Sequence, residues 1–358
     1  MDETRLLEEK RRLLTRTVPF ILAGLALFLI YLHFFVGFSN IIETFSKVNL
    51  GIFLIAVLMT LIDVSLFTFT WYYLLKAVSI EITFFKALAY ILTGIFVDIL
   101  IPAEAVSAEI SKIYLMNKDG VDVGKVAATL VTQRIYGMVI TASSMLFACL
   151  VLLLTSYPLP GMVVNLVLFA SGLTLIFLVL ILFFCVKKEL TEKVVRKILG
   201  FLKRILPQRL NIQSLEEITE NALNTFFPSL SFLAKTPKKL LVSIVSAVSS
   251  WIFCLLTSQF VFYSLGYYQI SFSVVVVVYS LSMIVQSIPA GIPAEVGITE
   301  IVMSWLYVLF GVAPPFAATA TILIRFLTVW LKFIMGFVAL QWIGIRGIVN
   351  KQKQIKQN

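Results

Sequence analysis

The sequence predicts an all-α polytopic membrane protein with six full spans and two re-entrant helical hairpins, arranged as an inverted-topology repeat. The first observation is composition: 60% of the 358 residues are hydrophobic and 13% are charged, whereas soluble domains are about half apolar and about a quarter charged. The second is that the apolar runs are long and continuous, which favours helices over the alternating strands of a membrane barrel. The third is an internal repeat that places charged residues among the apolar runs.

Long apolar segments give the expected spans in chain order. A helix needs roughly 20 residues to cross a hydrocarbon core of about 30 Å. Full spans are expected near residues 18–38, 50–75, 126–154, 162–186, 238–264 and 316–345. Residues 1–38 therefore form an N-terminal tail with the first span, and residues 155–237 connect two halves of the protein.

Two pairs of shorter apolar segments remain, and a proline motif interrupts each pair. The segments are residues 84–101 with 103–118, and residues 275–292 with 294–309. Segments of this length are marginal for a full crossing, so each pair is expected to enter and leave the membrane on one side. If each segment crossed fully instead, all other spans would keep their orientation. Repeat unit 1 is then residues 50–154 with hairpin 84–118, and repeat unit 2 is residues 238–345 with hairpin 275–309.

Positive charge is distributed very unevenly between the two expected faces. With the N-terminus inside, 25 of the 29 lysines and arginines lie in the inner tails and loops, and Lys47 alone lies in an outer loop. Basic residues concentrate in cytoplasmic loops, so both termini, including the basic tail 346–358, are expected in the cytoplasm of a multi-pass cell-membrane protein. The net charge of +10 then needs no nucleic-acid partner, and the basic face is expected to meet anionic lipid head groups.

The connecting segment carries an amphipathic pattern. Apolar residues recur at helical spacing from Leu190 to Leu206, and basic residues occupy the opposite face. This pattern is typical of a helix that lies on the inner membrane surface. A regulatory or partner-binding role for the segment is the alternative.

A gap-free shift of 191 residues aligns residues 101–134 with 292–325, and 11 of the 34 positions are identical. Shared apolar composition alone would not readily align two glutamates, a glycine and an arginine. The matching pairs include Pro102/Pro293, Glu104/Glu295, Glu109/Glu300, Gly120/Gly311 and Arg134/Arg325. Because the first spans of the two units run in opposite directions, the repeats are expected to be inverted about an axis in the membrane plane, as in many secondary transporters.

The repeated polar residues are the candidate site. Ionisable side chains at membrane depth are costly and normally face protein or water. The expected substrate-binding residues are Asp98, Pro102, Glu104, Glu109, Arg134, Pro293, Glu295, Gly297, Glu300 and Arg325. Two interpretations stay open. Either Glu109 pairs with Arg134 and Glu300 with Arg325 to fix the hairpins to the spans, or the same groups line a cavity for a charged head group.

The prolines suggest how such a cavity would bind an anion. Proline interrupts a helix because it lacks a backbone donor, and the helix that restarts after Pro102 or Pro293 would present free N–H groups to a phosphate. An arginine would supply a bidentate partner, and Gly297 would let the backbone approach closely. We expect no metal, cofactor or catalytic residue.

These motifs resemble those of the flippase-like family that includes the transmembrane region of lysylphosphatidylglycerol synthetase. The resemblance rests on DILIPAEAVSAEISKIYL from Asp98, on SIPAGIPAEVGITE, and on Gly311, Val312 and Arg325. The chain departs at Val106 and Ser107, where members often have glycine, and at Lys112, where they often have arginine. The resemblance implies an integral membrane protein that moves, or helps to move, a polar lipid between leaflets.

Three functions fit these patterns. The first is a lipid flippase or scramblase for a polar or phosphate-bearing lipid, an anionic or zwitterionic phospholipid or a glycolipid. The sequence contains no phosphate-binding GxxxxGK[ST] loop, so transport would be passive or coupled to protons or ions. The second is a secondary transporter of a small charged solute. The third and least favoured is a membrane enzyme acting on lipid-linked phosphate, so the expectation is that the chain is not an enzyme.

Overall fold

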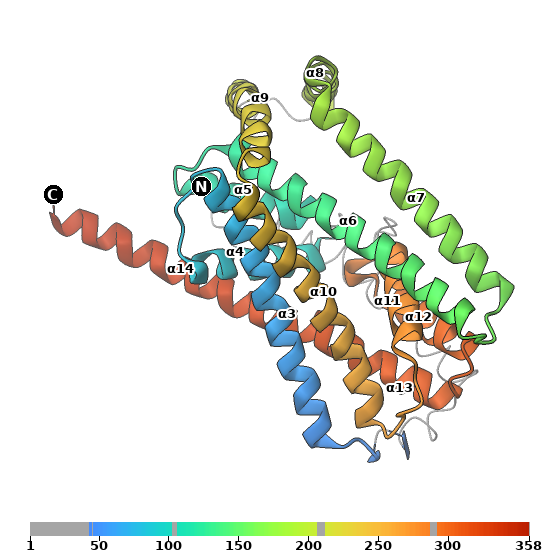
Figure 1. Cartoon of the computed structure of the whole chain (residues 1–358). Helices are drawn as coiled ribbons and strands as arrows, with labels where there is room; N and C mark the ends of the chain where they lie inside the picture. Colours follow the sequence, from blue (N-terminus) through green and yellow to red (C-terminus); the bar gives the residue numbers. More distant parts are fainter. Residues whose placement is uncertain (1–42, 45, 102–105, 206–211, 287–291, 358) are drawn as a thin grey trace.

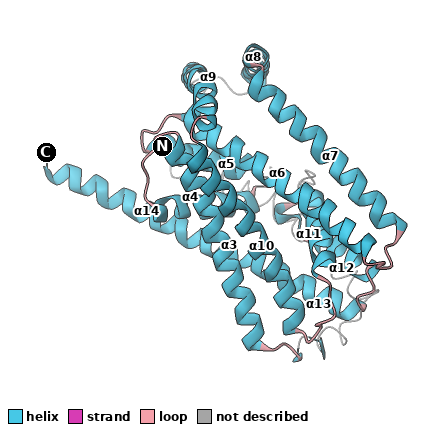
Figure 2. Cartoon of the chain, in the orientation of Figure 1, coloured by secondary structure: helices cyan, strands magenta, loops and turns pink. Residues whose placement is uncertain are grey.

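A computed structural model describes residues 43–44, 46–101, 106–205, 212–286 and 292–357 of the chain (Figure 1). Within these ranges the ordered elements are all helices, and no strand occurs (Figure 2). Five helical stretches are long and apolar enough to cross a membrane. They coincide with five of the six expected spans, while the expected span at residues 18–38 lies outside the described ranges. The chain is therefore an α-helical, polytopic membrane protein.

The spanning stretches begin and end close to the sequence-based expectations. Four are single helices: α3 (Leu50–Ala77), α6 (Val123–Leu154), α7 (Gly161–Val186) and α10 (Pro237–Ser264). The fifth combines α13 (Pro314–Arg325), a π-helical turn (Phe326–Leu331) and α14 (Lys332–Gln357). Their starts follow ordinary capping chemistry, since an N-cap side chain accepts orphan backbone N–H groups. Asn49 caps α3 through the amide of Ile52, and Asp122 caps α6 through the amides of Gly124 and Lys125.

Helices α3 and α10 lie side by side along much of their length and run in opposite directions (Figure 1). Hydrogen-bonding groups of the two helices contact each other near both ends of the pair and near its middle. The Ser264 carbonyl accepts from the Asn49 amide at 2.7 Å, the Thr60 and Thr257 hydroxyls lie 3.3 Å apart, and the Ser243 hydroxyl donates to the Thr70 carbonyl at 2.9 Å. The two halves of the chain thus meet along one antiparallel helix pair.

Each expected hairpin consists of two short helices that contact each other. The first is α4 (Phe84–Leu100) with α5 (Val106–Lys118), and the second is α11 (Phe272–Gln286) with α12 (Ile298–Leu309). Gly94 allows close packing in the first hairpin, because a Cβ atom at this position would lie 3.0 Å from the Ala108 carbonyl oxygen. A 3₁₀ turn, Pro293–Glu295, precedes α12.

The repeat is visible in the backbone at Gly120 and Gly311, which follow α5 and α12. Both glycines are left-handed, with φ of +79° and +82°. The residue after each glycine donates its amide to an equivalent carbonyl, Val121 to Met116 and Val312 to Tyr307. This is a helix C-terminus that uses glycine because other residues resist positive φ. The same sequence position therefore produces the same turn twice.

Each hairpin also packs against the last membrane helix of the other half. Helix α4 lies along α14, and α11 lies along α6. The first contact is very close at Gly336, where a Cβ atom would lie 2.4 Å from the Leu92 carbonyl oxygen. The ends of the two proline motifs meet as well, because Ile99 packs against Ala294, Val296 and Val329. The two halves consequently interlock at the interrupted ends of their hairpins.

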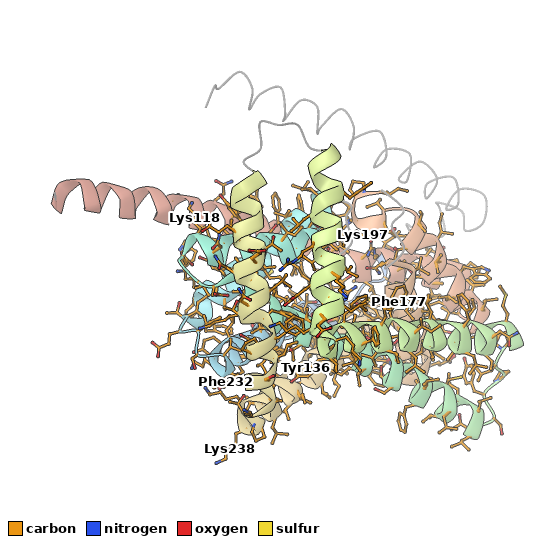
Figure 3. All side chains as sticks on the ribbon, turned by 90° about the horizontal axis from the view of Figure 1, so that it is seen from above. Lys118, Tyr136, Phe177, Lys197, Phe232 and Lys238 are labelled. Carbon is orange, nitrogen blue, oxygen red and sulfur yellow. The ribbon has the colours of Figure 1, made fainter. Side chains whose placement is uncertain are left out.

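The connecting segment forms two helices on one end of the molecule. Helices α8 (Lys188–Ile205) and α9 (Ile212–Ala234) run side by side there, as the view from above shows (Figure 3). Helix α9 packs against α6, where Gly124 admits the Ala222 carbonyl. Helix α8 corresponds to the expected amphipathic helix, and it exposes an apolar stripe that includes Leu190, Val194, Ile198 and Phe201.

Candidate functional site

The second proline motif is built around a buried ion pair. Arg325 ends α13, and its Nε donates to Oε1 of Glu300 in the first turn of α12 at 2.8 Å. Only 4% of the arginine side chain and 6% of the glutamate side chain are exposed. This pair belongs to one of the two interpretations that the sequence left open, in which the charges fix the hairpin to the span. It ties α12 to α13 where neither charge has access to solvent.

Arg325 also supports the strained part of the motif. Its second guanidinium branch donates to the Ala294 carbonyl. Ala294 and Glu295 have φ of +54° and +46°, a left-handed conformation that costs a non-glycine residue roughly 1–2 kcal/mol. Backbone of this kind persists where its surroundings hold it in place and is common at functional sites. The arginine therefore fixes the path of the chain between Pro293, which begins the turn, and α12.

The N-terminus of α12 is satisfied by its own side chain. The Gly297 amide donates to Oε2 of Glu300 at 2.7 Å, which is one half of a capping box, because Gly297 has no side chain to supply the other half. Gly297 itself is left-handed, with φ of +93°. The backbone donor that the sequence offered to a phosphate is thus held by a carboxylate in this arrangement. An incoming anion would have to replace Glu300 to reach this donor.

The first proline motif is arranged more openly. Asp98, near the end of α4, accepts from the Ser107 hydroxyl at the start of α5. Glu109 is half-buried, and both Lys112 and Arg134 lie near enough to act on its charge. Within the described ranges Glu109 and Arg134 form no ion pair, and Arg134 is exposed. In the second half the equivalent residues Glu300 and Arg325 form an ion pair, whereas the described Glu109 and Arg134 do not.

Lys112 lies with Asp98, Glu109 and Arg134. It was not among the site residues expected from the sequence, which showed only that it departs from the family motif. It is buried, and its Nζ lies 5.7 Å from the centre of the Trp71 ring, within the range of a cation–π contact. Two acidic and two basic side chains therefore gather around α5. Pro102 and Glu104, the other predicted members of this motif, lie outside the described residues.

A third charged contact joins α3 to α14 and was not predicted as a pair. Lys332 Nζ lies 2.8 Å from Oδ2 of Asp63, with 16% and 8% of the two side chains exposed. The Ser250 hydroxyl donates to Oδ1 of the same aspartate at 2.6 Å. Cys254, which the 191-residue shift places opposite Asp63, instead contacts the Tyr279 hydroxyl at 3.0 Å. The sequence marked both ionisable residues at membrane depth, but they are far apart in the chain and no repeat relates them.

The geometry thus shows charged groups gathered at two interrupted helix ends and one inter-helix pair. The model of the family described as the lysylphosphatidylglycerol synthase TM region matches residues 21–336. The chain belongs to this family. The match includes both proline motifs, Arg134, Arg325 and Lys332, and it confirms the family resemblance that the motifs indicated.

Archaeal membrane proteins are similar over most of the chain. A UPF0104 membrane protein from Pyrococcus horikoshii is 28% identical over 325 residues, covering 88% of this chain and 94% of the relative. One from Methanothermobacter thermautotrophicus is 25% identical over 317 residues, covering 86% and 90%. One from Methanocaldococcus jannaschii is 24% identical over 335 residues, covering 91% and 94%. No solved structure matches the chain.

Proposed function

We propose that the protein is a lipid flippase or scramblase that moves a polar or phosphate-bearing lipid between leaflets through a charged site near the membrane midplane. The observation that carries this proposal is the meeting of the two proline motifs. The turn held by Arg325 contacts the end of α4, where Asp98 lies. The end of the helix that carries Asp98 therefore lies against the turn that Arg325 holds.

The pattern of helix contacts supports an inverted repeat as the basis of transport. Contacts of α3 with α4 and α6 have counterparts in those of α10 with α11 and α13. The contact of α5 with α6 corresponds to that of α12 with α13, and the contact of α4 with α14 corresponds to that of α11 with α6. With α3 and α10 antiparallel, an axis perpendicular to both helices relates the halves. In the membrane this axis lies in the plane, as in alternating-access transporters.

The short hairpin helices support re-entry on opposite sides. Helices α4, α5, α11 and α12 have 17, 13, 15 and 12 residues, fewer than the roughly 20 that cross a bilayer core. One hairpin then opens to each leaflet while their interrupted ends share the interior. The non-helical backbone at these ends would then be surrounded by protein or line a cavity. Non-helical backbone is tolerated at membrane depth only in such surroundings.

The difference between the two motifs supports a transport step. In the first half Glu109 and Arg134 are not paired, so an anionic head group has a cation to meet. In the second half Arg325 is neutralised by Glu300, and a phosphate would have to displace that carboxylate. Exchange of Glu300 for phosphate on Arg325 would also release the Gly297 amide, while Arg325 would still hold the Ala294 carbonyl. Substrate binding would then be coupled to opening of the second hairpin.

The family supports a lipid as cargo, because its description names a synthase of a phospholipid. The test is movement of a tail-labelled fluorescent phosphatidylglycerol in proteoliposomes, read by chemical quenching of the outer leaflet. Arg134→Ala and Arg325→Ala should each lower the rate at least roughly tenfold, since loss of a charged hydrogen bond costs about 1.5–3 kcal/mol. Lys47→Ala, in an exposed pair, is the matched control. Unchanged rates in both arginine variants, or solute uptake without lipid movement, would contradict the proposal.

A further inference from the structure

We propose that the second half contains a neutral, oxygen-lined site between α10, α11, α12 and α13, which binds the hydroxyl groups of a polyol or sugar head group. This inference rests on the proposed function and names the class of lipid that the site would favour. It concerns neutral polar residues other than the charged site residues, and no repeat-based argument selected them. Their feature in common is a buried side-chain oxygen with no hydrogen-bond partner.

The orphan oxygens gather in one half. Within the described residues, nine buried side-chain atoms have no partner, and seven of them belong to the second unit. They come from all four helices: Ser258, Gln259, Ser280, Thr299, Tyr307, Thr319 and Thr321. All seven residues are at most 4% exposed. An unsatisfied buried polar group costs about 1–3 kcal/mol, so their concentration in one half of the chain calls for an explanation.

The equivalent positions of the first half are mostly apolar. The 191-residue shift places six apolar residues and one threonine at the equivalent positions: Phe67, Thr68, Ala89, Ala108, Met116, Ala128 and Leu130. The hydroxyl of Thr68 donates to the Val64 carbonyl at 2.8 Å, so it is satisfied. The polar oxygens are therefore dispensable for packing these helices, and their concentration in the second half points to binding.

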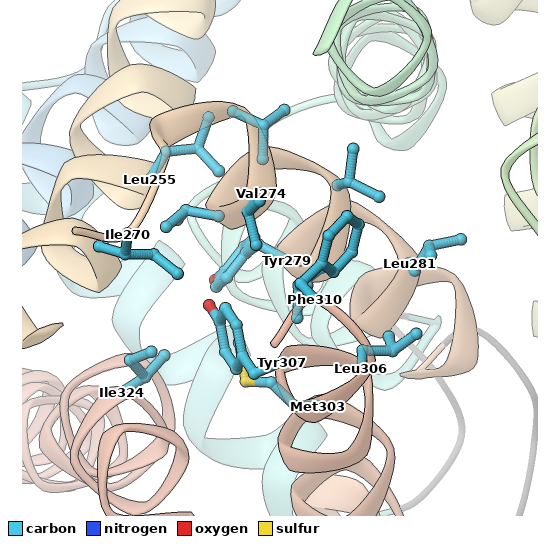
Figure 4. Packing of buried hydrophobic residues seen from close by; sticks show 14 of the residues in the cluster. Leu255, Ile270, Val274, Tyr279, Leu281, Met303, Leu306, Tyr307, Phe310 and Ile324 are labelled. Carbon is cyan, nitrogen blue, oxygen red and sulfur yellow. The ribbon is translucent and has the colours of Figure 1, made fainter. Parts of the chain in front are cut away.

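The four helices contact one another in turn, and the core packed between them includes Tyr279 and Tyr307. Helix α10 contacts α11, α11 contacts α12, α12 contacts α13, and α13 contacts α10. Inside this ring the hydroxyl groups of Tyr279 and Tyr307 point toward each other (Figure 4). The Tyr307 side chain is fully buried and its hydroxyl has no partner. Ligand sites in helical bundles are built from side chains that converge between facing helices in this way.

The oxygens extend from the charged motif along the ring. Thr321 precedes Arg325 by four residues, one helical turn on the same face, and Thr299 precedes Glu300. Thr299 and Tyr307 are eight residues apart on α12, so the lining covers about 12 Å at 1.5 Å per residue. A head group whose phosphate reaches Arg325 would therefore extend its outer part into this lining.

The chemistry of the lining selects the ligand. Six of the seven groups are hydroxyls, which donate and accept, and the seventh is the carbonyl oxygen of Gln259, which only accepts. The Gln259 amide nitrogen already donates to the Ile270 carbonyl. A ligand must therefore supply donors as well as acceptors, and burying an ammonium group or a second phosphate among neutral oxygens would be costly. Hydroxyl groups on a neutral polyol meet both conditions.

The test compares binding of two lipids by the full chain. Phosphatidylinositol carries a polyol beyond its phosphate, and phosphatidic acid carries the phosphate alone. Native mass spectrometry of the protein with each lipid should show roughly tenfold preference for phosphatidylinositol, the effect of one to two net hydrogen bonds. Tyr307→Phe and Thr321→Val should remove this preference without weakening phosphatidic acid. Thr68→Val, a satisfied hydroxyl at an equivalent position, should keep it.

Two further readouts separate the possible failures. Removal of an unsatisfied hydroxyl should raise the unfolding temperature of lipid-free Tyr307→Phe and Thr321→Val, because no hydrogen bond is lost. Equal weakening of both lipids, or equal affinity of the wild-type protein for both, would overturn the site. Stabilisation by free myo-inositol at matched concentration would overturn the assignment to a lipid head group. Binding without lipid movement would contradict the flippase proposal and leave this site standing.

Discussion

Arg325 connects three parts of the second half at the scale of single atoms. One branch of its guanidinium group meets Glu300, and another meets the Ala294 carbonyl in a left-handed turn. Glu300 in turn holds the Gly297 amide. A buried charge can persist here because both Glu300 oxygens and two of the three Arg325 nitrogens have partners. The arrangement is consequently sensitive to loss of either charge.

Removing one partner of this pair should destabilise the protein strongly. Arg325→Met leaves the Glu300 carboxylate buried and uncompensated, which costs about 3–5 kcal/mol. The double variant Glu300→Leu with Arg325→Met should recover much of the loss, because no isolated charge remains. Thermal or denaturant unfolding in micelles measures both. Lys47→Met should change little, since the pair of Lys47 with Glu43 is exposed. A double variant no more stable than Arg325→Met would contradict the ion-pair explanation.

Individual contacts could be predicted where the repeat or local chemistry determined them. The aligned motifs suggested the Glu300–Arg325 pair as one of two interpretations, and the equivalent Glu109–Arg134 pair of that interpretation does not form in the described part of the chain. The Asp63–Lys332 pair could not be predicted, because its members lie 269 positions apart and have Cys254 and Thr141 as their counterparts. Ala294 also escaped prediction, since nothing local marks an alanine for positive φ. Its conformation depends on an arginine that lies 31 positions away.

At the scale of elements, the ends of helices depend on a few glycines. Gly120 is left-handed and has open space around its Cα atom. Gly120→Ala should therefore cost about 1–2 kcal/mol of stability from backbone strain alone. Gly137 lies inside α6, also with open space, and Gly137→Ala should instead stabilise by about 0.5–1 kcal/mol. The two variants should therefore change the free energy of unfolding in opposite directions. Equal changes in both would argue against strain at Gly120.

Contact between the halves depends on a different property of glycine. A Cβ atom at Gly336 would lie 2.4 Å from the Leu92 carbonyl oxygen and 2.7 Å from the Phe96 Cβ atom. Gly336→Ala should therefore push α4 away from α14, lower stability by about 1–3 kcal/mol and slow lipid movement, since α4 carries Asp98. Gly344→Ala, on the same helix with open space, is the control. Equal lipid movement in the two variants would contradict a role for this contact.

Most elements could be predicted because apolar length determines them. The expected span 162–186 and the helix Gly161–Val186 differ by one residue, since a loop with two prolines precedes it and a lysine pair follows. The second hairpin was less predictable. Its outgoing helix begins at Ile298 rather than at residue 294, because Ala294 and Glu295 are left-handed and Gly297 serves as the cap. The π-helical turn at Phe326–Leu331 has no signal in hydropathy.

At the scale of the molecule, an inverted arrangement would place the same ends of equivalent helices on opposite sides. Helix α5 ends near Lys118, whereas α10 ends at Ser264 before the loop that contains Tyr268. If the basic face lies in the cytoplasm, Lys118 is expected on the inner side and Tyr268 on the outer side. Helix α10 is the counterpart of α3, and a re-entrant hairpin would return the end of α5 to the side where α3 ends. Repeats of the same orientation would therefore place Lys118 and Tyr268 on one side. The side on which Tyr268 lies therefore distinguishes inverted repeats from repeats of the same orientation.

Labelling of single cysteines tests this directly. The three native cysteines are free, and two of them are buried, so a cysteine-free parent supplies the background. Tyr268→Cys, at a side chain that is 62% exposed, should react with a membrane-impermeant maleimide in intact cells. Lys118→Cys, also exposed, should react only after the membrane is opened. Reaction of both variants from one side would place both loops on the same face, and the two halves would then have no axis in the membrane plane.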